Sequence, residues 1–491
     1  MIDGTDARAD QRGPTGDHIL LITIDDLNDW VGCLSDPIDP DRPGPMVTGR
    51  GHPQASTPNL DRLAKRGVLF TNAHCQAPIC RPSRISFMSG LRPTTTGVYA
   101  NRAQFDADGP LNAGQDVPWM TKRFEAAGYE VFTAGKVLHA SRNAPLGGTP
   151  CFPTSQGPYP EEKIGVPPRI TPAGIWDIGP FPPTMEQYTD YRIAEWMAGH
   201  IQQPLTEADA PRFFALGFYN PHVPLLAPPP FFEAAPKLED VLLGATREDD
   251  FDDLPEIAKR MGNRVFFQGV ENWLLADEQE LRKLTQAYLA CTTAMDACIG
   301  QVIEALDRSD LADNTWVVVL SDHGWHLGEK NHIAKQTLWS RSTQVPLIIV
   351  PPRRMTDTPR GVRCDRPTEL IDIYPTLLAA AALPPTDSDQ HLDGLDLLPW
   401  LTDPNREKPR PALTTIYAHN HSLVGDRYRY TRYADGSEEL YDRQNDPHEF
   451  DNLINQVERR PDLQAAIDRL SEWIPENEPG EPDLLLGGKG R

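Results

Sequence analysis

The chain has 491 residues, 70 acidic and 47 basic, and a formal charge of -23 at pH 7. This length accommodates two or three domains with sizeable cores. The charge argues against a protein that binds nucleic acid through a general basic surface. No apolar run predicts a membrane span, and residues 1–16 are polar, so no signal peptide is visible. We therefore expect a cytoplasmic protein, or a periplasmic or secreted one if a leader has been removed.

The first predicted element is a strand followed by two carboxylates. Ile19 to Ile24 is a continuous apolar run, which is typical of a strand buried in a parallel sheet. Asp25 and Asp26 follow it directly. Buried carboxylates need a cation or hydrogen bonds, so a cation site is one interpretation. A solvated loop or a helix cap is the other.

A helix and a short strand come next. Thr57 is a candidate N-cap, Pro58 suits the first helical position, and Gly67 suits the position after the last turn. Residues 68–70 then have the composition of a strand, and the chain continues to Cys80.

Three further predicted strands each end at polar residues. The strands at 130–134, 213–218 and 316–320 follow predicted helices at 120–127, 188–202 and 277–306. Ligands gather at the carboxyl ends of strands in open α/β sheets. We therefore expect the polar side chains at the ends of these strands and of the first strand to converge, and these are Asp25, Asp26, Lys136, His222, Asp322 and His323.

Other segments carry less information. Residues 228–272 are rich in Pro and acidic residues with little periodicity, so we expect a surface insertion near the mouth of the site. Residues 345–350 predict a strand and residues 369–382 a helix. The seven cysteines show no zinc spacing. Cys291 and Cys298 lie on a predicted helix, where core packing is expected.

The alternation of strands and helices predicts an α/β fold, with a large doubly wound mixed sheet flanked by helices. After residue 403 the pattern changes. Residues 427–433 alternate at period two, Asp435-Gly436 is a hairpin signal, and residues 461–474 predict a helix. We expect a tail at 1–16, a catalytic domain at 17–403, and a smaller C-terminal α+β subdomain with an antiparallel sheet at 404–491.

The strongest prediction of chemistry comes from Cys80-Arg81-Pro82-Ser83-Arg84, followed by Met88-Ser89-Gly90. Pro82 suits a first helical turn and Gly90 a helix end. Cys80 would then lie at a helix N-terminus with Arg84 one turn further on. Both the helix dipole and the guanidinium favour an anion there. A buried structural cysteine is the alternative.

The polar residues after the strands suggest a metal site and an anion site. Asp25, Asp26 and Asp322 would suit a hard cation such as Ca2+, which prefers oxygen ligands, whereas the imidazole of His323 favours softer metals. An acidic protein needs a local cationic pocket to bind an anion, and several cations would suit a sulfate ester. Each cation alone has an ordinary surface or core interpretation. The candidates are Arg84, Lys136, His139, His222 and Lys335.

The motif C-x-P-S-R followed by M-S-G resembles the signature of type I sulfatases, a family of the alkaline phosphatase superfamily. In that family a formylglycine-generating enzyme oxidises the cysteine to an aldehyde. The resemblance is closest to the iduronate-2-sulfatase branch, with choline-sulfatases more distant. It covers most of the chain, and the other similar blocks are Thr23–Leu27, Ala134–His139, Pro221–Pro224, Ser321–Glu329, Leu440–Asp442 and Asp446–Leu453.

The resemblance implies a set of roles. Cys80 would become formylglycine with help from Arg84, and one Ca2+ per chain would be held by Asp25, Asp26, Asp322, His323 and residue 80. Lys136 and His139 would steady the hydrated aldehyde, and Lys335 and His222 would contact the sulfate and the leaving oxygen. The hydrate would attack sulfur and expel the alcohol, with His222 or Lys335 as the acid. Its second hydroxyl would then expel sulfate and restore the aldehyde.

The resemblance also implies a sulfated carbohydrate substrate, with a 2-O-sulfated uronate as a hypothesis. The sequence departs from that branch in two places: Asn220 stands where the branch carries Lys, and the stretch around Ile333 lacks the aromatic residue that the branch carries there. Loss of the lysine charge weakens the uronate hypothesis. The candidate substrate contacts are Trp325, His326, His332 and Asn220. For Trp325 and His326, packing below the metal loop is the alternative.

Three other functions remain compatible with the sequence. The protein could hydrolyse choline sulfate, or it could hydrolyse phosphate diesters or phosphonate monoesters with the same formylglycine. A protein of another class, which binds sugars and in which Cys80 is never converted, is the third alternative.

Overall fold

The computed structural model describes residues 16–37, 46–47, 50–101, 119–139, 151–152, 156–166, 176–206, 210–262 and 268–481. Except for Gly16, the predicted N-terminal tail lies outside these residues.

A mixed sheet forms the centre of the molecule, and within the described residues it has eight strands in the order β13-β2-β12-β9-β1-β7-β4-β5. All of them run in one direction except β12, which is antiparallel to both neighbours. The predicted large mixed sheet is therefore confirmed. Its strands are β1 (His18–Ile24), β2 (Val68–Phe70), β4 (Glu130–Gly135), β5 (Cys151–Phe152), β7 (Arg212–Phe218), β9 (Thr315–Ser321), β12 (Leu347–Val350) and β13 (Val362–Cys364).

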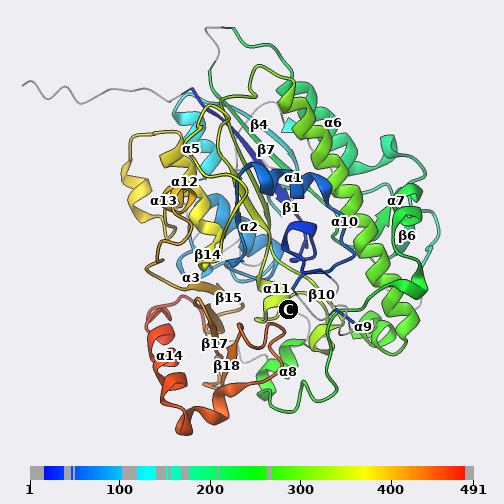
Figure 1. Ribbon diagram of the computed structural model, residues 1–491, viewed down its shortest axis with the longest axis vertical. Coiled ribbons are helices and arrows are strands. Elements are labelled where there is room, and N and C mark those ends of the chain that lie inside the picture. The colour runs from blue at the N-terminus through cyan, green and yellow to red at the C-terminus, as the bar shows by residue number, and fades with distance from the viewer. Residues whose placement is uncertain are drawn as a thin grey trace, which may run out of the picture.

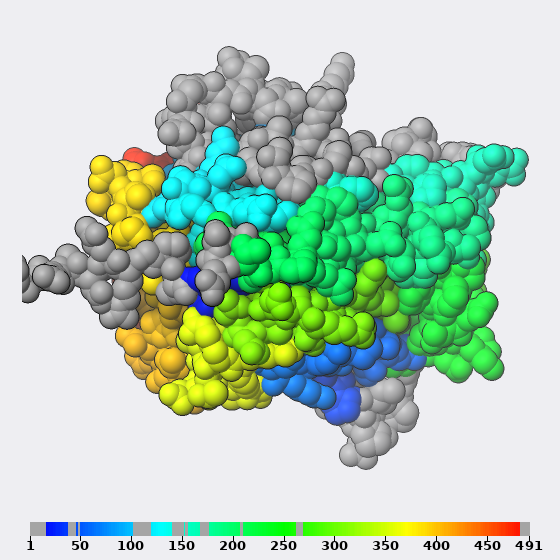
Figure 2. Space-filling model, turned by 90° about the horizontal axis from the view of Figure 1, so that it is seen from above, coloured from blue at the N-terminus to red at the C-terminus, as the bar shows by residue number. Residues whose placement is uncertain are grey.

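Both faces of this sheet are buried, which explains the unbroken apolar runs of its central strands. In β1, Leu20 and Ile22 belong to one core, whereas Ile19 and Leu21 belong to the other. Figure 1 shows the helices on the two sides of the sheet, and Figure 2 shows the α6 segment beside the end of α10. Helices α1 (Pro58–Arg66), α6 (Thr189–Ile201) and α10 (Glu278–Asp307) contribute to the first core, and α2 (Cys80–Ser89), α5 (Met120–Ala126), α12 (Ile373–Ala380) and α13 (Leu398–Thr402) to the second.

Thr57 occupies the N-cap position of α1, as predicted, but the N–H groups of this helix are capped from another helix. The Thr57 side chain makes no cap hydrogen bond to α1. Asp296 of α10 instead accepts the backbone N–H groups of Asn59 (3.0 Å) and Leu60 (2.9 Å). A carboxylate near these free N–H groups also interacts favourably with the helix dipole. This contact joins α1 to α10 across the core.

Gly67 follows α1 as predicted, but for a different reason. Its φ of -142° is not left-handed. A Cβ at this position would lie 2.2 Å from the carbonyl oxygen of Ile349 in β12. Close approach of two backbones therefore requires glycine here.

Helix α10 differs from the expectation that no segment is apolar and long enough to span a membrane. Within the described residues it is the one helix long and apolar enough to pass a test for a membrane span, with mean hydropathy 1.3 over its most apolar window. Of that window, 78% is buried inside the protein. Cys291 and Cys298 lie on α10 as buried free thiols, so their predicted core packing is confirmed.

The segment 228–272 is more ordered than predicted. It contains α7 (Pro229–Ala234), α8 (Glu256–Gly262) and α9 (Gln268–Leu275). Val241, Leu254 and Ile257 are buried, whereas residues 229–240 are all partly or fully exposed, so the surface insertion stays a prediction. These helices have only six to eight residues, too few to show a clear helical period in the sequence.

The C-terminal part forms an antiparallel sheet, as predicted, with the order β15-β16-β17-β18. Helix α14 (Pro461–Ser471) packs Leu463 and Ile467 into the same core as Leu423 and Tyr430. The sheet joins the larger part through the N–H of Thr415, which donates to Gln76 O at 2.9 Å. The division at residue 403 stays a prediction. The strands are β15 (Ala412–Thr415), β16 (His421–Val424), β17 (Tyr428–Arg432) and β18 (Glu438–Asp442).

Short elements connect these parts. Strand β3 pairs with β14, β6 with β8, and β10 with β11. These elements are α3 (Pro93–Thr96), α11 (Ser340–Thr343), β3 (Ala73–His74), β6 (Ile178–Pro180), β8 (Leu225–Ala227), β10 (His326–Leu327), β11 (Ile333–Ala334) and β14 (Thr368–Glu369).

Candidate active site

Four neighbouring strands end at the same edge of the sheet. The pairing aligns Ile24 of β1 with Phe218 of β7 and Ser321 of β9, and Gly135 of β4 with Gly217 of β7. The loops that follow these strands therefore start side by side. The predicted convergence of the strand ends is confirmed.

Two glycines bring β4 and β7 together at this edge. Gly135 has φ +67°, and a Cβ there would lie 2.1 Å from Gly217 O. A Cβ on Gly217 would lie 1.9 Å from Lys136 O. The close approach lets the N–H of Lys136 donate to Gly217 O at 2.8 Å, which fixes where the lysine leaves the sheet.

Arg84 lies fully buried at the centre of the cluster. Helix α2 begins at Cys80 and ends at Gly90, whose φ is 72°, as the motif predicted. Arg84 donates from Nε to Asp322 Oδ2 (2.8 Å) and from Nη2 to Asp25 Oδ1 (3.2 Å). It also donates to the carbonyl of Lys136. The guanidinium therefore links α2 to the ends of three strands.

Position 80 is surrounded by positive groups. The Cys80 Sγ lies 3.0 Å from Lys335 Nζ and 3.3 Å from His323 Nε2. Burial opposes ionisation of this thiol, but the charges of Lys136, Lys335 and His323 outweigh it and hold the pKa of Cys80 well below its ordinary value. A hydrogen bond from His139 acts in the same direction. The site is thus built to stabilise negative charge on residue 80.

The carboxylates beside residue 80 form a candidate metal site. Ligand atoms of Asp25, Asp26, Cys80 and His323 lie within 4.8 Å of one another, and all four residues are buried. Asp26 Oδ1 accepts from Lys335 Nζ at 2.6 Å. Asp26 Oδ2 is buried and has no hydrogen-bond partner among the described residues. An unsatisfied carboxylate oxygen in this position suits a cation.

Backbone geometry aims Asp26 into the site. Its φ of 63° is left-handed, a conformation that Asp tolerates better than most residues. Tyr288 of α10 donates its hydroxyl to Asp26 O at 2.8 Å and accepts the N–H of Asn28 at 2.9 Å. No sequence signal marks this tyrosine, because it lies within an ordinary helical apolar pattern.

Asp322 and His323 differ in their availability to a metal. Asp322 Oδ1 accepts the N–H groups of Asp26 (3.1 Å) and His323 (2.9 Å), and its other oxygen is held by Arg84. Burial raises the pKa of Asp322 to about 7. His323 Nδ1 donates to Gly324 O at 3.0 Å, which points Nε2 toward residue 80. Asp322 lies outside the compact four-residue group.

His222 lies on the more open side of the cluster. Its Nε2 is 3.8 Å from Asp26 Oδ2, and its side chain is 20% exposed. Nδ1 donates to Val223 O at 2.6 Å. The loop is held by Asp190 of α6, whose two oxygens accept the N–H groups of Tyr219 and Asn220, each at 2.9 Å.

Lys335 sits in a constrained loop. The residues on either side of it, Ala334 and Gln336, have φ values of 91° and 76°, which cost conformational energy in a non-glycine residue. The ring of His332 holds this loop, because Nε2 donates to Lys335 O (3.0 Å) and Nδ1 contacts Glu271 Oε1 (2.6 Å). Glu271 comes from α9, a partner that no sequence signal indicated.

The candidate substrate contacts are all buried. Trp325 is 1% exposed, and His326 is 0% exposed with its ring nitrogens 2.9 Å from Glu329 O and 2.8 Å from Thr337 Oγ1. These positions correspond to the packing alternative. The two ring nitrogens of His332 contact Lys335 O and Glu271 Oε1. The Asn220 amide donates to Leu226 O at 3.2 Å. All four side chains are buried, although Asn220 also lines a small pocket beside Tyr159 and Pro182.

A family model described as Sulfatase matches residues 17–383. The chain is a member of the sulfatase family. A second model, described as N-sulphoglucosamine sulphohydrolase, C-terminal, matches residues 328–474. The sulfatase is therefore an enzyme, as predicted, and both of its parts are covered by models.

Individual relatives agree with this assignment. The sulfatase is 33% identical over 466 residues to a sulfatase of Formosa agariphila, covering 91% of this chain and 85% of the relative. It is 27% identical over 426 residues to the iduronate 2-sulfatase of Mus musculus, covering 75% and 69%. A phosphonate monoester hydrolase of Agrobacterium radiobacter has a similar structure, with a TM-score of 0.68, 21% identity, and coverage of 93% of this chain and 95% of that chain. That last likeness concerns the fold alone.

Proposed function

We propose that this sulfatase removes an O-sulfate group from a sulfated sugar, with formylglycine formed from Cys80 as the nucleophile and Ca2+ as the metal. The observation that carries the proposal is the position of residue 80. It lies at the N-terminus of α2, touches Lys335 and His323, and shares a site of 4.8 Å extent with Asp25 and Asp26.

The donor set fits a hard cation. Asp25 and Asp26 supply carboxylate oxygens, Asp26 Oδ2 is otherwise unsatisfied, and the hydrated form of residue 80 would add another oxygen. His323 would contribute Nε2, and Asp322 would join through Oδ2, which lies 3.6 Å from that nitrogen. Bound there, the ion would acidify the oxygen on residue 80 and polarise the sulfate group.

The surrounding cations have separate tasks. Lys136 and His139 would hold the oxygens of the hydrated residue 80, and Arg84 would keep Asp25 and Asp322 in place from below. Lys335 would bind a sulfate oxygen, where its charge lowers the free energy of the transition state.

His222 would protonate the leaving oxygen. Because its Nδ1–H is committed to Val223 O, Nε2 would carry the transferable proton in the imidazolium form. His222 is also more exposed than the buried groups beside residue 80, which suits contact with the alcohol part of a substrate.

The sugar assignment rests on the relatives. The iduronate 2-sulfatase is a relative of this chain, and we propose a 2-O-sulfated uronate as the finer hypothesis. Asn220 and Ile333 depart from the pattern expected of that branch, so sulfates at other ring positions belong in the first substrate panel.

The test begins with protein from cells that co-express a formylglycine-generating enzyme. We expect the mass of the Cys80 peptide to show an aldehyde or its hydrate. Sulfate release is then measured from 2-O-, 4-O-, 6-O- and N-sulfated sugars, choline sulfate and an aryl phosphonate. Release from a sugar O-sulfate, lost when calcium is chelated and restored by its return, is the expected result. Turnover confined to choline sulfate or the phosphonate would contradict the proposal, and an unconverted thiol would favour a binding protein.

A further inference from the structure

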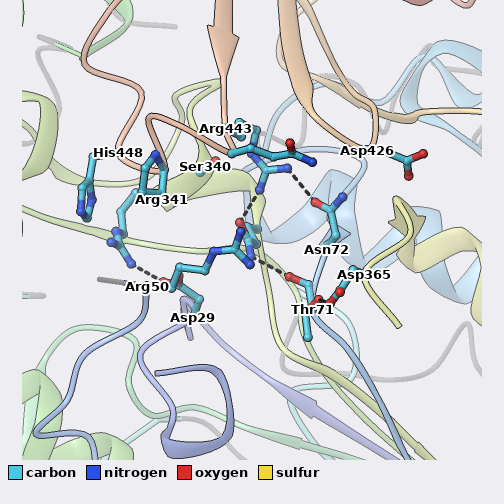
Figure 3. A pocket seen from close by; sticks show the side chains of 13 residues that line it. Asp29, Arg50, Thr71, Asn72, Ser340, Arg341, Asp365, Asp426, Arg443 and His448 are labelled. Carbon is cyan, nitrogen blue, oxygen red and sulfur yellow. Dashed lines mark hydrogen bonds and ion pairs between the residues drawn. The ribbon is translucent and has the colours of Figure 1, made fainter. Parts of the chain in front are cut away.

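A second site is suggested by a cavity of about 170 Å³ between the end of β2, α11 and the C-terminal sheet (Figure 3). None of its lining residues belongs to the cluster around residue 80. We call it the Arg443 pocket. Its charged walls carry Arg50, Arg341, Arg443, Asp29, Asp365 and Asp426.

Arg443 is incompletely neutralised in this pocket. It donates to two neutral oxygens, Asn72 Oδ1 at 2.7 Å and Gln344 Oε1 at 2.8 Å. Its carboxylate neighbour, Glu449 Oε1, is 3.6 Å from Nε and is already held by Arg429 at 2.6 Å. The guanidinium therefore keeps positive charge that no described carboxylate contacts closely.

The surroundings of Arg443 also disfavour its positive charge. Burial, with repulsion from Arg429 and Arg50, lowers the pKa of Arg443 to about 9. Arg50 and Arg443 line the same pocket and repel each other, and a negative group that contacts both would reduce that repulsion.

The other charged residues of the pocket have partners of their own. Arg341 pairs with Asp29, and also with Glu329 at 3.0 Å. On the opposite side, Asp365 accepts the Thr71 hydroxyl, and Asp426 accepts from Arg366 at 3.0 Å.

The pocket is therefore polarised. Figure 3 shows Arg50 and Arg443 apart from Asp365 and Asp426. The cationic part suits an anion, and the acidic part suits groups that donate hydrogen bonds.

We propose that the Arg443 pocket binds an anionic sugar unit, with its carboxylate or sulfate between Arg50 and Arg443. The forked N–H groups of arginine match the oxygens of such anions. Sugar hydroxyls would donate to Asp365 and Asp426, because carboxylates accept only. The volume suits one small unit, since sites for drug-sized ligands usually exceed about 300 Å³. That the unit belongs to the same carbohydrate as the substrate rests on the proposed function, whereas binding itself needs no turnover.

The experiment is calorimetric titration of the full chain carrying Cys80→Ala with glucuronate, glucose 6-sulfate, glucose and inorganic sulfate. We expect the two anionic sugars to bind at least about 10-fold more tightly than glucose or inorganic sulfate. Arg50→Gln and Arg443→Gln should each weaken that binding about 10-fold. Arg353→Gln is the matched control, because Arg353 is 41% exposed and pairs with Asp307 instead.

Other outcomes separate the parts of the inference. Lys335→Ala should leave the binding in place; loss of binding in that variant alone would assign it to the catalytic cluster and overturn the proposal. Unchanged affinity in Arg50→Gln would also overturn it, and this variant lies on an exposed wall, so it keeps the test open if Arg443→Gln misfolds. Equal affinity for inorganic sulfate would overturn the sugar assignment. If Arg50-dependent sugar binding persists while no sulfated sugar is hydrolysed, the pocket stands and the proposed function fails.

Discussion

Two buried clusters of charge show how differently this protein uses ionised side chains. In one, Glu369 and Asp372 meet Arg92, Lys408 and Arg410 near the start of α12. Each carboxylate oxygen there accepts a hydrogen bond from one of these cations. Backbone N–H groups also donate: that of Leu413 to Glu369, and that of Glu369 to Asp372. This set, the Asp372 cluster, fastens residues 404–413 to the larger part of the molecule.

The cluster around residue 80 is more deeply buried, and its carboxylate oxygens are incompletely satisfied. Asp26 Oδ2 has no partner among the described residues, and three cations surround a residue that is not a carboxylate. Burial of charge therefore does not distinguish a functional site from a structural one. An unsatisfied acceptor beside a potential nucleophile, at the carboxyl ends of parallel strands, does.

The largest expected effect comes from removing the nucleophile. Cys80→Ala should lower sulfate release at least about 10⁴-fold, because no other group can form the covalent intermediate. Cys75→Ala is the matched control, since Cys75 is another buried free thiol whose pKa is raised by burial. Release is measured with wild-type protein in which conversion of Cys80 has been verified by mass. Equal losses in the two variants would show that the effect is structural.

Replacing one aspartate in each cluster should mainly lower stability in one case, and mainly lower calcium affinity and activity in the other. Asp372→Asn leaves Lys408 and Arg410 without a charged partner and should cost about 3–5 kcal/mol of unfolding free energy, with kcat retained. Asp26→Asn should lower Ca2+ affinity and sulfate release at least about 100-fold with a smaller change in stability. Denaturant titration and calorimetry of calcium binding measure the two quantities. A calcium affinity unchanged in Asp26→Asn would remove this residue from the metal site.

The pH dependence of stability should reflect Asp190. Burial raises its pKa from 3.8 to about 7, so the native state keeps a proton that the unfolded state releases. The stabilisation is then complete below about pH 4 and disappears as the pH rises through 7. We expect wild type to lose about 1 kcal/mol per pH unit, about 3 kcal/mol between pH 4 and 7, relative to Asp190→Asn. Parallel stability profiles for the two proteins would show that Asp190 is ionised throughout.

The smallest expected effect concerns the support of Lys335. Glu271→Ala removes the partner of His332 and should lower kcat about 10-fold with little change in KM, because the loop would lose its exact position. Glu271→Gln, which keeps an acceptor for His332 and Ile333, should restore most of the activity. Glu256→Ala is the control, since Glu256 is exposed on α8. If Gln rescues nothing, the role of Glu271 lies in its charge and not in its hydrogen bonds.

Local patterns in the sequence were sufficient for the main elements of the site. The apolar run of β1, the Pro and Gly positions of α2, and the polar residues after β4, β7 and β9 depend on backbone preference and periodicity over a few residues. These features predicted that Asp25 and Asp322 would lie together, because the carboxyl ends of neighbouring parallel strands must meet, and that Cys80 would lie at a helix N-terminus. The resemblance to the sulfatase family also came from short motifs, above all the one that begins at Cys80.

Only the tertiary structure determined which side chains complete the site and which are enclosed by it. Glu271 reaches His332 across 61 positions of sequence, and Asp296 caps α1 across 236. Such partners depend on how helices pack on the sheet, and a local pattern contains no record of that packing. The same reason explains why His326 proved internal, and why the Arg443 pocket, assembled from seven separate stretches of chain, had no signature in the sequence.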